Sequence, residues 1–393
     1  MIYYIKQNGV NEMKKVLFTI TSLGAGGAEK VLVDLVANLD RSKYEIHVFS
    51  IYNDGIYISE IMKYAKYHYG ITLKNKKNFF TKLINRIKVA FVRHVPAKLL
   101  YTIFLSRGKY DIEISFLEGW STKLIAASMN KSKKYAWVHT DMIQNPHADY
   151  AYKNRAKHLK AYKKYNKIIF VSQEAKEKFV EKFPEITQEL LVCNNPIDIN
   201  KIKILCKEPV SNEWDNTKIN IVAVGRLVKV KGFERLINAC NDISKDSIEF
   251  CLNIIGDGEL RNELEKCAKP LIQDGLCRFW GYQSNPYKFI EHADICVSSS
   301  YTEGAGVFIC EALALNKLVL ATKCPGSVSM LKNGTYGVIC DNSEKGIYLS
   351  LKNVLLNYKK LKDHFNLYYP ENVREYRADY VANKISKILL EDD

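Results

Sequence analysis

The stretch ADICVSSSYTEGAGVFICEALALNKLVLAT, residues 293–322, contains the pattern that decides the fold. An apolar run with polar bounds at residues 293–300 is followed by a glycine turn, an apolar helical pattern from Val307 and a second strand-like run at residues 318–322. A strand, a helix and another strand in this order are typical of a parallel α/β sheet, which binds ligands at the carboxyl ends of its strands. The turn between strand and helix is therefore predicted to be part of a binding site.

This turn combines the features of an anion site with two carboxylates. Gly304 and Gly306 allow a tight turn, and the helix that opens at Val307 presents unpaired N–H groups and a positive dipole end to a phosphate. Glu303, before the helix, and Glu311, near its first turn, would repel phosphate alone. They are expected to accept hydrogen bonds from hydroxyl groups at opposite ends of a ligand such as a sugar nucleotide. Taken alone, the pair equally fits a loop residue and the solvated face of an ordinary helix.

A second glycine-bounded loop supplies cations. The run IVAVGRLVKVKG, residues 221–232, ends a predicted strand at Gly225 and Arg226 and carries Lys231 before its last glycine. The two cations are expected to neutralise a diphosphate leaving group, with solvated loop charges as the alternative. Gly256 follows the next predicted strand and permits close approach of a nucleotide, although this signal is weak by itself.

Length and composition set further limits. A chain of 393 residues has room for two to three domains, and no run of 18 apolar residues predicts a membrane-spanning helix. The first dozen residues lack the apolar core of a signal peptide, and Met13 is an alternative start to Met1, so we expect a cytoplasmic protein. The ten cysteines form no C-x-x-C pair and are expected to be buried free thiols rather than disulfides or zinc ligands.

The net charge of +15 is concentrated in the first half of the chain. Residues 1–200 hold 32 Lys and Arg against 18 Asp and Glu, and the region 63–109 holds twelve Lys and Arg without an acidic residue. Within this region apolar residues recur largely at helical spacing, namely Phe79, Phe80, Leu83, Ile84, Ile87, Ala90, Phe91 and Val95. The pattern predicts an amphipathic helix that binds an anionic membrane surface, with a buried helix and a solvated lysine face as the alternative. Nucleic acid is a weaker option, because no nucleic-acid-binding motif accompanies the charge.

Strand-like and helix-like patterns alternate through both halves, which predicts two Rossmann-like domains with parallel sheets. The predicted strands cover residues 15–21, 45–51, 111–117, 134–139, 167–171, 190–193, 219–224, 250–255, 294–298, 318–322 and 337–340, and clear helical patterns cover residues 28–39, 122–129 and 174–183. A polar stretch at residues 207–218 is the predicted linker. We therefore expect an N-terminal domain over residues 1–200, a C-terminal domain over residues 201–370, and a C-terminal helix over residues 371–393 that packs back toward the first domain. The chemistry is expected in a cleft between the two domains.

The N-terminal domain contributes further candidates. Gly26 and Gly27 belong to a glycine-rich loop before the first helix, which we interpret as admitting the acceptor or a diphosphate. The loop is a poor dinucleotide fingerprint, because no acidic residue for a ribose ends the second predicted strand. His139 closes another strand and is expected to hydrogen-bond the reacting sugar, with a structural role equally open. No Asp-x-Asp signature is present, so neither a catalytic metal nor another cofactor is expected.

These motifs together resemble the retaining glycosyltransferases of family 4, which have the two-domain GT-B fold. The resemblance covers nearly the whole chain, through GAGGAEK, WVHTD, NPID, VGRLVKVKG and TEGAGVFICEALALNKLVLATKCPG in the expected order. The resemblance implies two Rossmann-like domains that face each other across a cleft. It also implies transfer of a sugar from a nucleotide donor with retention, by departure and attack on one face and without an obvious protein nucleophile.

The resemblance also assigns roles to individual residues. Glu303 would contact the transferred sugar, Glu311 the nucleotide ribose, and Arg226 with Lys231 the diphosphate. The backbone from Gly306 to Phe308 would complete the phosphate site, and His139 would lie near C6 of the sugar. One departure from the family is Ala305 after Gly304, where an aromatic residue is common, which loosens the assignment of the donor pocket.

Members with this pattern often extend lipid-linked glycans of surface polymers, which implies a glycan acceptor and a peripheral place on the inner face of the membrane. UDP is the expected nucleotide, from the habits of the family. Two alternatives stay open. One is a metal-free UDP-sugar 2-epimerase on the same fold, which would turn over its substrate without an acceptor. The other is a basic membrane- or nucleic-acid-binding protein without enzymatic activity, which would show salt-sensitive binding and no affinity for sugar nucleotides.

Overall fold

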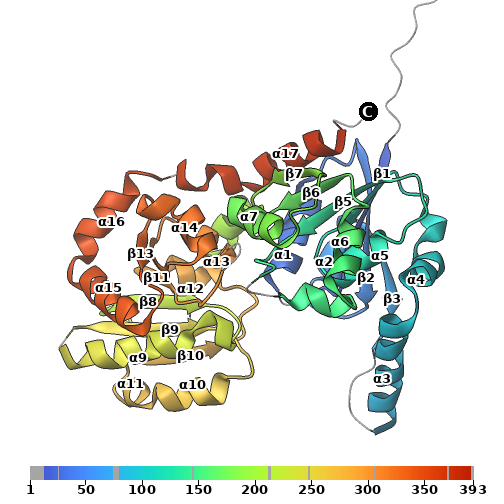
Figure 1. The fold of residues 1–393 in the computed structure, drawn as a ribbon. Coiled ribbons are helices and arrows are strands. Elements are labelled where there is room, and N and C mark those ends of the chain that lie inside the picture. Colours follow the sequence, from blue (N-terminus) through green and yellow to red (C-terminus); the bar gives the residue numbers. More distant parts are fainter. Residues whose placement is uncertain are drawn as a thin grey trace, which may run out of the picture. The chain divides into compact units, whose positions relative to one another are not determined.

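The computed structural model describes residues 13–24, 26–73, 79–143, 146–210, 214–246, 248–303, 306–369 and 371–390. The chain divides into two compact units. Unit 1 comprises Met1–Phe170, Lys178–Cys193 and Ala382–Asp393, and unit 2 comprises Val171–Glu177 and Asn194–Val381. Each unit is built around one parallel sheet that is covered by helices (Figure 1).

Unit 1 contains a seven-stranded parallel sheet in the order β3-β2-β1-β4-β5-β6-β7. Its strands are β1 (Lys14–Ile20), β2 (Tyr44–Tyr52), β3 (Lys66–Ile71), β4 (Ile112–Ser115), β5 (Lys133–Val138), β6 (Lys167–Phe170) and β7 (Glu189–Val192). The strand order changes direction between β1 and β4, which is the switch point at which open α/β sheets bind ligands. The loops that follow β1, β4 and β5 therefore reach the edge of the sheet where a site is expected.

The helices of unit 1 connect these strands. They are α1 (Gly27–Asn38), α2 (Ile58–Ile61), α3 (Phe79–His94), α4 (Ala97–Phe104), η1 (Ser106–Gly108), α5 (Trp120–Ile125), η2 (Pro146–Ala151), α6 (Arg155–Tyr162) and the second half of α7 (Gln173–Lys182). Aromatic side chains fill the space between α6, α7 and the sheet, where Tyr162, Phe179 and Phe183 are fully buried and in mutual ring contact. This packing fixes α6 and α7 on the sheet.

Unit 2 contains a six-stranded parallel sheet in the order β10-β9-β8-β11-β12-β13. Its strands are β8 (Ile219–Val224), β9 (Phe250–Ile255), β10 (Cys277–Gly281), β11 (Ile295–Ser298), β12 (Leu318–Thr322) and β13 (Val338–Cys340). The order changes direction between β8 and β11, so the loops after these two strands meet at the switch point. These are the two loops that carry the predicted donor residues.

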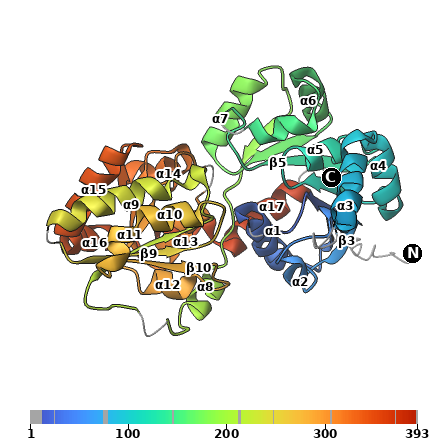
Figure 2. The same ribbon diagram turned by 90° about the horizontal axis from the view of Figure 1, so that it is seen from below.

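Helices cover both faces of this sheet (Figure 2). They are α8 (Ile199–Leu205), η3 (Lys229–Lys231), α9 (Phe233–Ile243), η4 (Ser244–Asp246), α10 (Arg261–Cys267), α11 (Lys269–Gln273), α12 (Tyr287–Glu291), α13 (Val307–Ala314), α14 (Pro325–Met330), η5 (Lys332–Gly334), α15 (Glu344–Leu356), α16 (Tyr358–Asn366) and η6 (Glu371–Tyr376). Side chains alternate between two cores along the strands: Ile295 and Val297 pack with α9 and α15, and Cys296 packs with α12 and α13. Burial on both faces explains why these strands are continuous apolar runs in the sequence.

The predicted strands all correspond to strands of the structure, and three of them, at residues 219–224, 250–255 and 318–322, agree in both bounds. Two strands were missed, β3 (Lys66–Ile71) and β10 (Cys277–Gly281). Both are edge strands, which pair on one side only and do not need a continuous apolar run. The basic region 63–109 is therefore not helical throughout, because β3 lies inside it.

The predicted linker at residues 207–218 is not where the chain passes between the units. The chain enters unit 2 at Asn194, and α8 already belongs to this unit. Ile202 of α8 is buried in the same core as α12 and α13. The polar stretch that resembled a linker lies within unit 2, between α8 and β8.

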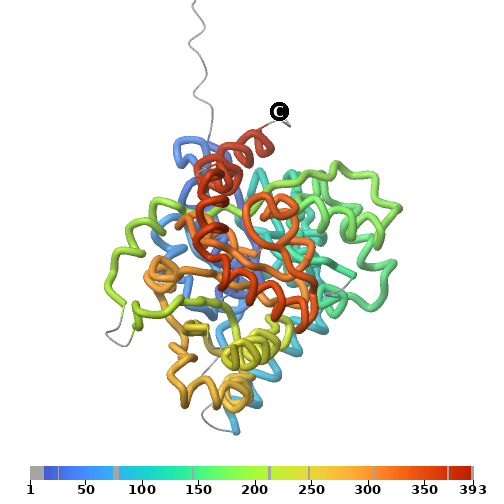
Figure 3. Tube along the Cα trace, turned by 90° about the vertical axis from the view of Figure 1, so that its left-hand side faces the viewer, coloured from blue at the N-terminus to red at the C-terminus, as the bar shows by residue number. Residues whose placement is uncertain are grey.

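The last helix, α17 (Ala378–Leu390), returns the chain to unit 1. Figure 3 shows it in red near the blue N-terminal strands. Tyr44 of β2 is 1% exposed, and its Oη lies 2.8 Å from Ser386 Oγ and 3.1 Å from the Ser386 carbonyl oxygen. Lys384 Nζ donates to the carbonyl of Val192 at 2.9 Å. The C-terminal residues thus complete the first sheet's packing.

Helix α3 exposes most of its apolar side chains and extends away from the sheet of unit 1 (Figure 1). Among its described side chains only Asn85 and Val92 are buried. The exposed apolar side chains are Phe79 at 73%, Phe80 at 72%, Leu83 at 44%, Ile84 at 40%, Ile87 at 60% and Phe91 at 39%. No described helix is both long and apolar enough to cross a membrane. Of the two interpretations of this segment, the one with a buried apolar face is wrong for this chain.

All ten cysteines are free thiols, as predicted. Nine of them are buried and Cys267 is partly exposed. Burial raises the pKa of the Cys193 thiol to about 12. These side chains therefore behave as small apolar groups of the cores.

Candidate functional site

In unit 2 the loops after β8 and β11 bring the predicted cation and carboxylate together. Lys231 lies in η3 after β8, and Glu303 follows β11. Lys231 Nζ lies 2.6 Å from Glu303 Oε2, with the two side chains 30% and 15% exposed. The Ser300 hydroxyl also donates to Glu303 Oε2 at 3.2 Å. Because this pair is partly buried at the switch point, it is held in place and still reachable by a ligand.

Arg226 also follows β8, but unlike Lys231 it has no carboxylate partner among the described residues. Its side chain is exposed and forms no ion pair or side-chain hydrogen bond with a described residue. Lys231 runs back toward this strand end, since a Cβ on Gly225 would lie 3.8 Å from Lys231 Cδ. The loop therefore offers one ammonium that is already paired with a carboxylate and one guanidinium that is free for an anionic ligand.

The N-terminus of α13 lies directly behind this pair. Gly306 precedes Val307, the first residue of the helix, and does not cap it with a side chain. The first hydrogen bonds of the helix come from Ile309 and Cys310 to the Gly306 carbonyl, so the N–H groups of Val307 and Phe308 have no partner among the described residues. Free N–H groups and the helix dipole suit a phosphate here. Gly304, also predicted for this site, lies outside the described residues.

Glycine is required beside the carboxylate at this turn. A Cβ on Gly306 would lie 3.2 Å from Glu303 Cγ and 3.0 Å from Ile309 Cδ1. Such contacts are tighter than packing normally allows, so a larger residue would displace the carboxylate. The glycine turn therefore positions Glu303 as well as opening the helix terminus.

Glu311 is the fifth residue of α13 and lies directly after the first turn of the helix. It is 6% exposed, and the Tyr287 hydroxyl donates to its Oε1 at 3.2 Å. A carboxylate on the buried side of a helix is not the solvated side chain of the alternative interpretation. Its burial is compatible with binding a ligand hydroxyl, and Tyr287 is a partner that sequence spacing did not reveal.

Gly256 has a structural role that differs from the predicted approach to a nucleotide. Its φ is 144°, and a Cβ at this position would lie 1.9 Å from the carbonyl oxygen of Gly225. The N–H of Gly225 donates in turn to the Ile255 carbonyl at 3.0 Å. The two glycines therefore allow the loops after β8 and β9 to pack backbone against backbone.

Arg235 of α9 supports the same region and was missed in the sequence. It is 5% exposed, donates to the Ser299 carbonyl at 2.5 Å and to Asn342 Oδ1 at 2.9 Å, and lies 3.6 Å from the centre of the Tyr301 ring. A buried guanidinium with these partners fixes the backbone just before Glu303. The available signal was a charged residue on the apolar face of a helix.

In unit 1 the predicted histidine lies at the end of β5. His139 is 7% exposed, its ring packs against Phe116 at 4.9 Å, and burial lowers its pKa to about 3. Its Nε2 is buried without a hydrogen-bond partner among the described residues. The N–H of His139 donates to Glu118 Oε2 at 3.1 Å, and the Thr140 hydroxyl donates to Oε1 at 2.5 Å. His139 is therefore a neutral imidazole with one buried ring nitrogen that has no partner among the described residues.

The glycine-rich loop of unit 1 is occupied by a carboxylate. Gly26 precedes Gly27, the first residue of α1, and a Cβ on Gly26 would lie 2.0 Å from Glu29 Oε2. An anion at this helix terminus would meet the negative charge of Glu29. Of the two expected occupants of this loop, a hydroxyl-bearing acceptor suits it better than a diphosphate.

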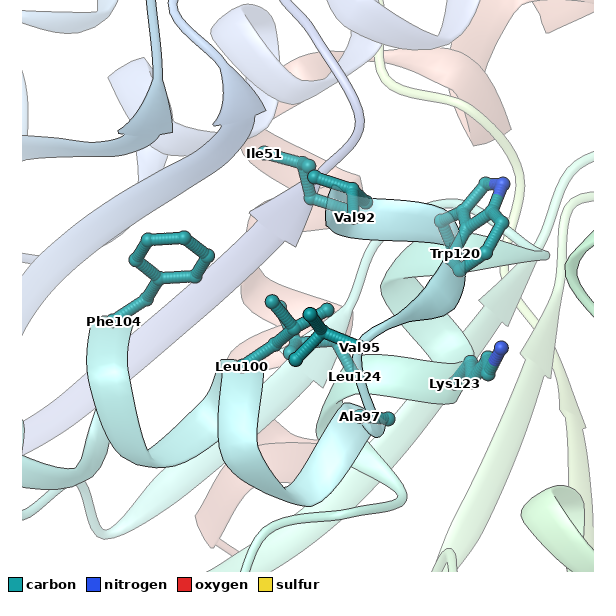
Figure 4. A pocket seen from close by; sticks show the side chains of 9 residues that line it. All are labelled: Ile51, Val92, Val95, Ala97, Leu100, Phe104, Trp120, Lys123 and Leu124. Atoms are coloured by element: carbon teal, nitrogen blue, oxygen red, sulfur yellow. The ribbon is translucent and has the colours of Figure 1, made fainter. Parts of the chain in front are cut away.

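An apolar crevice in unit 1 is too small to be the ligand site (Figure 4). It lies between β2, α3, α4 and α5, and its walls include Ile51, Val92, Leu100 and Trp120. Its volume is about 10 Å³, which is roughly the space that one water molecule needs. Elsewhere in the described residues, no three His, Cys, Asp or Glu side chains gather as a metal site.

The comparison with protein families identifies the part of the chain that carries the donor residues. Residues 207–366 match the model of the family described as glycosyl transferases group 1, and this range includes Arg226, Lys231, Glu303 and Glu311. The matched range is less than half of the chain, so the match shows a likeness of this range alone. The Lys231–Glu303 pair thus lies within the matched range.

Two relatives of this chain cover different shares of its length. An uncharacterized glycosyltransferase of Methanocaldococcus jannaschii is 29% identical over 234 residues, which cover 58% of this chain and 56% of that relative. The N-acetylgalactosamine-N,N'-diacetylbacillosaminyl-diphospho-undecaprenol 4-alpha-N-acetylgalactosaminyltransferase of Campylobacter jejuni is 26% identical over 363 residues, which cover 90% of this chain and 93% of that relative. The chain therefore spans about half the length of the first relative and nearly all of the second.

The fold of the chain agrees with solved structures. The crystal structure of Anabaena HepE in complex with UDP and glucose is similar with a TM-score of 0.74 at 17% identity, and covers 96% of this chain and 100% of that chain. The two parallel Rossmann-like sheets and this likeness confirm the GT-B fold class. The cleft that we expect between the two domains stays a prediction, as do the boundaries at residues 200 and 370.

Proposed function

We propose that the chain is a retaining glycosyltransferase that moves a sugar from a nucleoside diphosphate sugar, with UDP as the expected nucleotide, to a hydroxyl of a lipid-linked glycan. The observation that carries the proposal is the Lys231–Glu303 pair beside the open N-terminus of α13. The family match and the Campylobacter relative, whose acceptor is named as a diphospho-undecaprenol, support it. The structural neighbour that binds UDP and glucose supports the choice of nucleotide.

In the proposed reaction the bond between the sugar C1 and the diphosphate oxygen breaks, and its electron pair leaves with the nucleoside diphosphate. Arg226, Lys231 and the free N–H groups of Val307 and Phe308 stabilise the negative charge that develops on the diphosphate. The acceptor oxygen bonds to C1 on the same face, and its proton passes to the departing phosphate oxygen. Because protein cations and N–H groups supply the positive charge, we propose that no metal takes part.

The carboxylates bind the two ends of the donor. Glu303 accepts a hydrogen bond from the transferred sugar, and Lys231 turns from this carboxylate toward the phosphate when the donor is present. Glu311 accepts from the ribose hydroxyls and is fixed by Tyr287. His139, neutral and with Nε2 free among the described residues, accepts from or donates to the sugar.

We also propose that the protein is cytoplasmic and binds the anionic inner surface of a membrane through the region 63–109. The exposed apolar row of α3 and its basic side chains support this role. Lys76 and Lys77 of this region lie outside the described residues. A peripheral position would bring the enzyme to a lipid-linked acceptor.

The test of the donor site is a thermal-shift titration with UDP, GDP and ADP and their sugar derivatives. A ligand at about 100 times its Kd adds about 2.7 kcal/mol of apparent stability, so the correct nucleotide will be evident. Glu311→Ala should weaken binding of that nucleotide at least tenfold, because a buried hydroxyl partner is lost. Glu263→Ala, an exposed glutamate of α10, is the control and should bind normally. The proposal is contradicted if no nucleotide raises the melting temperature, or if Glu311→Ala binds the nucleotide with unchanged affinity.

A further inference from the structure

A second candidate site lies in unit 1, in a pocket between α5 and α6. Its volume is about 280 Å³, and five of its nine lining residues are lysines, namely Lys123, Lys153, Lys157, Lys160 and Lys164. The others are alanines and Tyr152. No carboxylate lines this pocket. None of the donor residues of unit 2 belongs to it, so it is a separate feature of the molecule.

Four of the five ammonium groups have no partner. Lys153, Lys157, Lys160 and Lys164 form no salt bridge and no side-chain hydrogen bond with a described residue. Elsewhere in the same unit carboxylates do neutralise lysines, as where Asp149 holds Lys182 Nζ at 2.7 Å. The lysine pocket, defined by these five residues, is therefore a local concentration of uncompensated positive charge.

Lys123 forms the inner wall of the pocket. Its Nζ donates to the Ala151 carbonyl at 2.8 Å and lies 4.4 Å from the centre of the Trp120 ring. Figure 4 shows this side chain beside the apolar crevice that Trp120 and Leu124 line. Burial, and then the charges of Lys153 and Lys157, lower the pKa of Lys123. An anion in the pocket would relieve this repulsion.

The chemistry of the lining favours a phosphate over other anions. Four ammonium groups without a partner among the described residues, each with three donors, match a ligand with many oxygens on one centre, such as a phosphate or diphosphate. None of the five is an arginine, so there is no planar fork for a single carboxylate. Tyr152 stacks on His158 at 4.0 Å, which takes up one face of its ring and leaves less of it for a nucleic-acid base.

Tyr152, at one end of the pocket, contacts the chain segment that also holds His139. The Tyr152 hydroxyl donates to the Gly119 carbonyl at 3.4 Å, and Gly119 follows Glu118, which holds the backbone of His139. Gly119 also precedes the first residue of α5, the helix that carries Lys123. The pocket and the His139 region thus share one short segment of chain, within unit 1.

We propose that the lysine pocket is an anion site that binds a phosphate or diphosphate group, separate from the donor site of unit 2. Two sources have this chemistry, a soluble phosphate compound and the diphosphate of a lipid-linked acceptor. The second source rests on the proposed function, and the first does not.

The test is a calorimetric titration of the full chain with inorganic pyrophosphate in the presence of saturating UDP. UDP occupies the donor site, so the remaining pyrophosphate binding reports on the lysine pocket. We expect one site, with an affinity that falls as salt is raised. Lys153→Glu/Lys157→Glu should weaken this binding at least tenfold and leave UDP binding unchanged. Lys153 directly precedes the N-cap Asn154 of α6, and Lys157 lies in the first turn of this helix, where acidic residues are favourable, so the variant should fold.

The control is Lys359→Glu/Lys360→Glu, which makes the same change of charge in the first turn of α16 and should bind pyrophosphate like the wild type. No pyrophosphate binding by the UDP-saturated wild type, or equal affinity in the two variants, overturns the proposal. Failure of UDP to bind contradicts the proposed donor site alone. Farnesyl diphosphate separates the sources: tighter binding than pyrophosphate assigns a lipid diphosphate, and equal binding assigns a soluble phosphate.

Discussion

At the scale of single residues, the site of unit 2 combines one carboxylate with two cations, of which only one is paired with it. Glu303 is held by Lys231 and Ser300, while Arg226 is exposed and unpaired among the described residues. A partly buried pair at 2.6 Å holds both side chains in position before the donor arrives. Little reorganisation is therefore needed when a diphosphate replaces the Glu303 carboxylate as the partner of the Lys231 ammonium group.

Replacing Lys231 by alanine tests this balance. We expect Lys231→Ala to lower kcat by about 10²-fold or more, because it removes a cation that stabilises the leaving diphosphate. Lys229→Ala is a matched control, since Lys229 lies in the same short helix η3 and is exposed. Steady-state kinetics with the donor identified by thermal shift measure both variants. Near-wild-type turnover in Lys231→Ala would remove it from the reaction.

A buried histidine makes the stability of the protein sensitive to acid. The pKa of His139 is about 3 in the folded protein and about 6.5 in the unfolded chain. As the pH falls below about 6.5 the unfolded chain takes up a proton that the folded protein does not bind until about pH 3. The free energy of unfolding therefore decreases with falling pH in this window, and this loss is absent above it.

His139→Gln should reduce this sensitivity. We expect the melting temperature of the variant to fall less between pH 7.5 and pH 5 than that of the wild type. Burial also lowers the pKa of His158, to about 4, so part of the acid sensitivity will persist in the variant. His94→Gln changes an exposed histidine and serves as the control. Identical pH dependence in His139→Gln and the wild type would contradict the burial argument.

At the scale of elements, α3 is the part of unit 1 whose apolar side chains are not used for packing. An apolar row that includes Phe79, Leu83 and Ile87 is exposed, and Lys82, Arg86 and Lys88 lie on the same helix. In water such a row is unfavourable, whereas at a membrane surface it is buried among lipid and the cations meet anionic headgroups. The element is thus suited to the proposed peripheral attachment.

Charge reversal on α3 tests the attachment. Lys82→Glu/Arg86→Glu should weaken binding to vesicles that contain phosphatidylglycerol, because each cation near the surface contributes about 1 kcal/mol. Nucleotide affinity should not change, since α3 belongs to unit 1 and the donor residues belong to unit 2. Lys359→Glu/Lys360→Glu again provides a variant with the same net charge. Retained vesicle binding in the α3 variant, measured by co-sedimentation, would refute this role.

At the scale of the whole molecule, the chain ends by returning to the sheet in which it began. Residues 382–393 belong to unit 1 although residues 194–381 belong to unit 2. Ile385 and Leu389 are almost fully buried along α17. Residues of β2 and α17, which are far apart in the sequence, therefore stabilise one unit together.

Tyr44→Phe measures this long-range contact. The variant keeps the ring and removes the hydroxyl that meets Ser386 across 342 positions of sequence. We expect a loss of about 1–3 kcal/mol in the free energy of unfolding, because buried polar atoms of Ser386 lose their partner. Tyr150→Phe, at a side chain that is 80% exposed, should change the stability by less than about 0.5 kcal/mol. Equal urea midpoints for both variants would show that the contact contributes nothing.

The sequence by itself determined the alternation of strands and helices, and therefore two parallel sheets. Strands buried on both faces, such as β8, β9 and β12, are continuous apolar runs, so their bounds were predicted to the residue. Glycines and charges at strand ends also marked Arg226, Lys231 and Glu303, because a parallel sheet binds at that edge. The edge strands β3 and β10 were missed, since one-sided pairing leaves no apolar run.

Only the tertiary structure decided which of these groups meet. The contact between Lys231 and Glu303 joins residues 72 positions apart, and Glu311 finds Tyr287 only because two helices pack on one face of the sheet. The lysine pocket likewise forms from α5 and α6, whose charges look like ordinary surface lysines in the sequence. The local sequence pattern reflects the burial and the backbone geometry of each element, whereas pairing between distant side chains depends on how the elements pack.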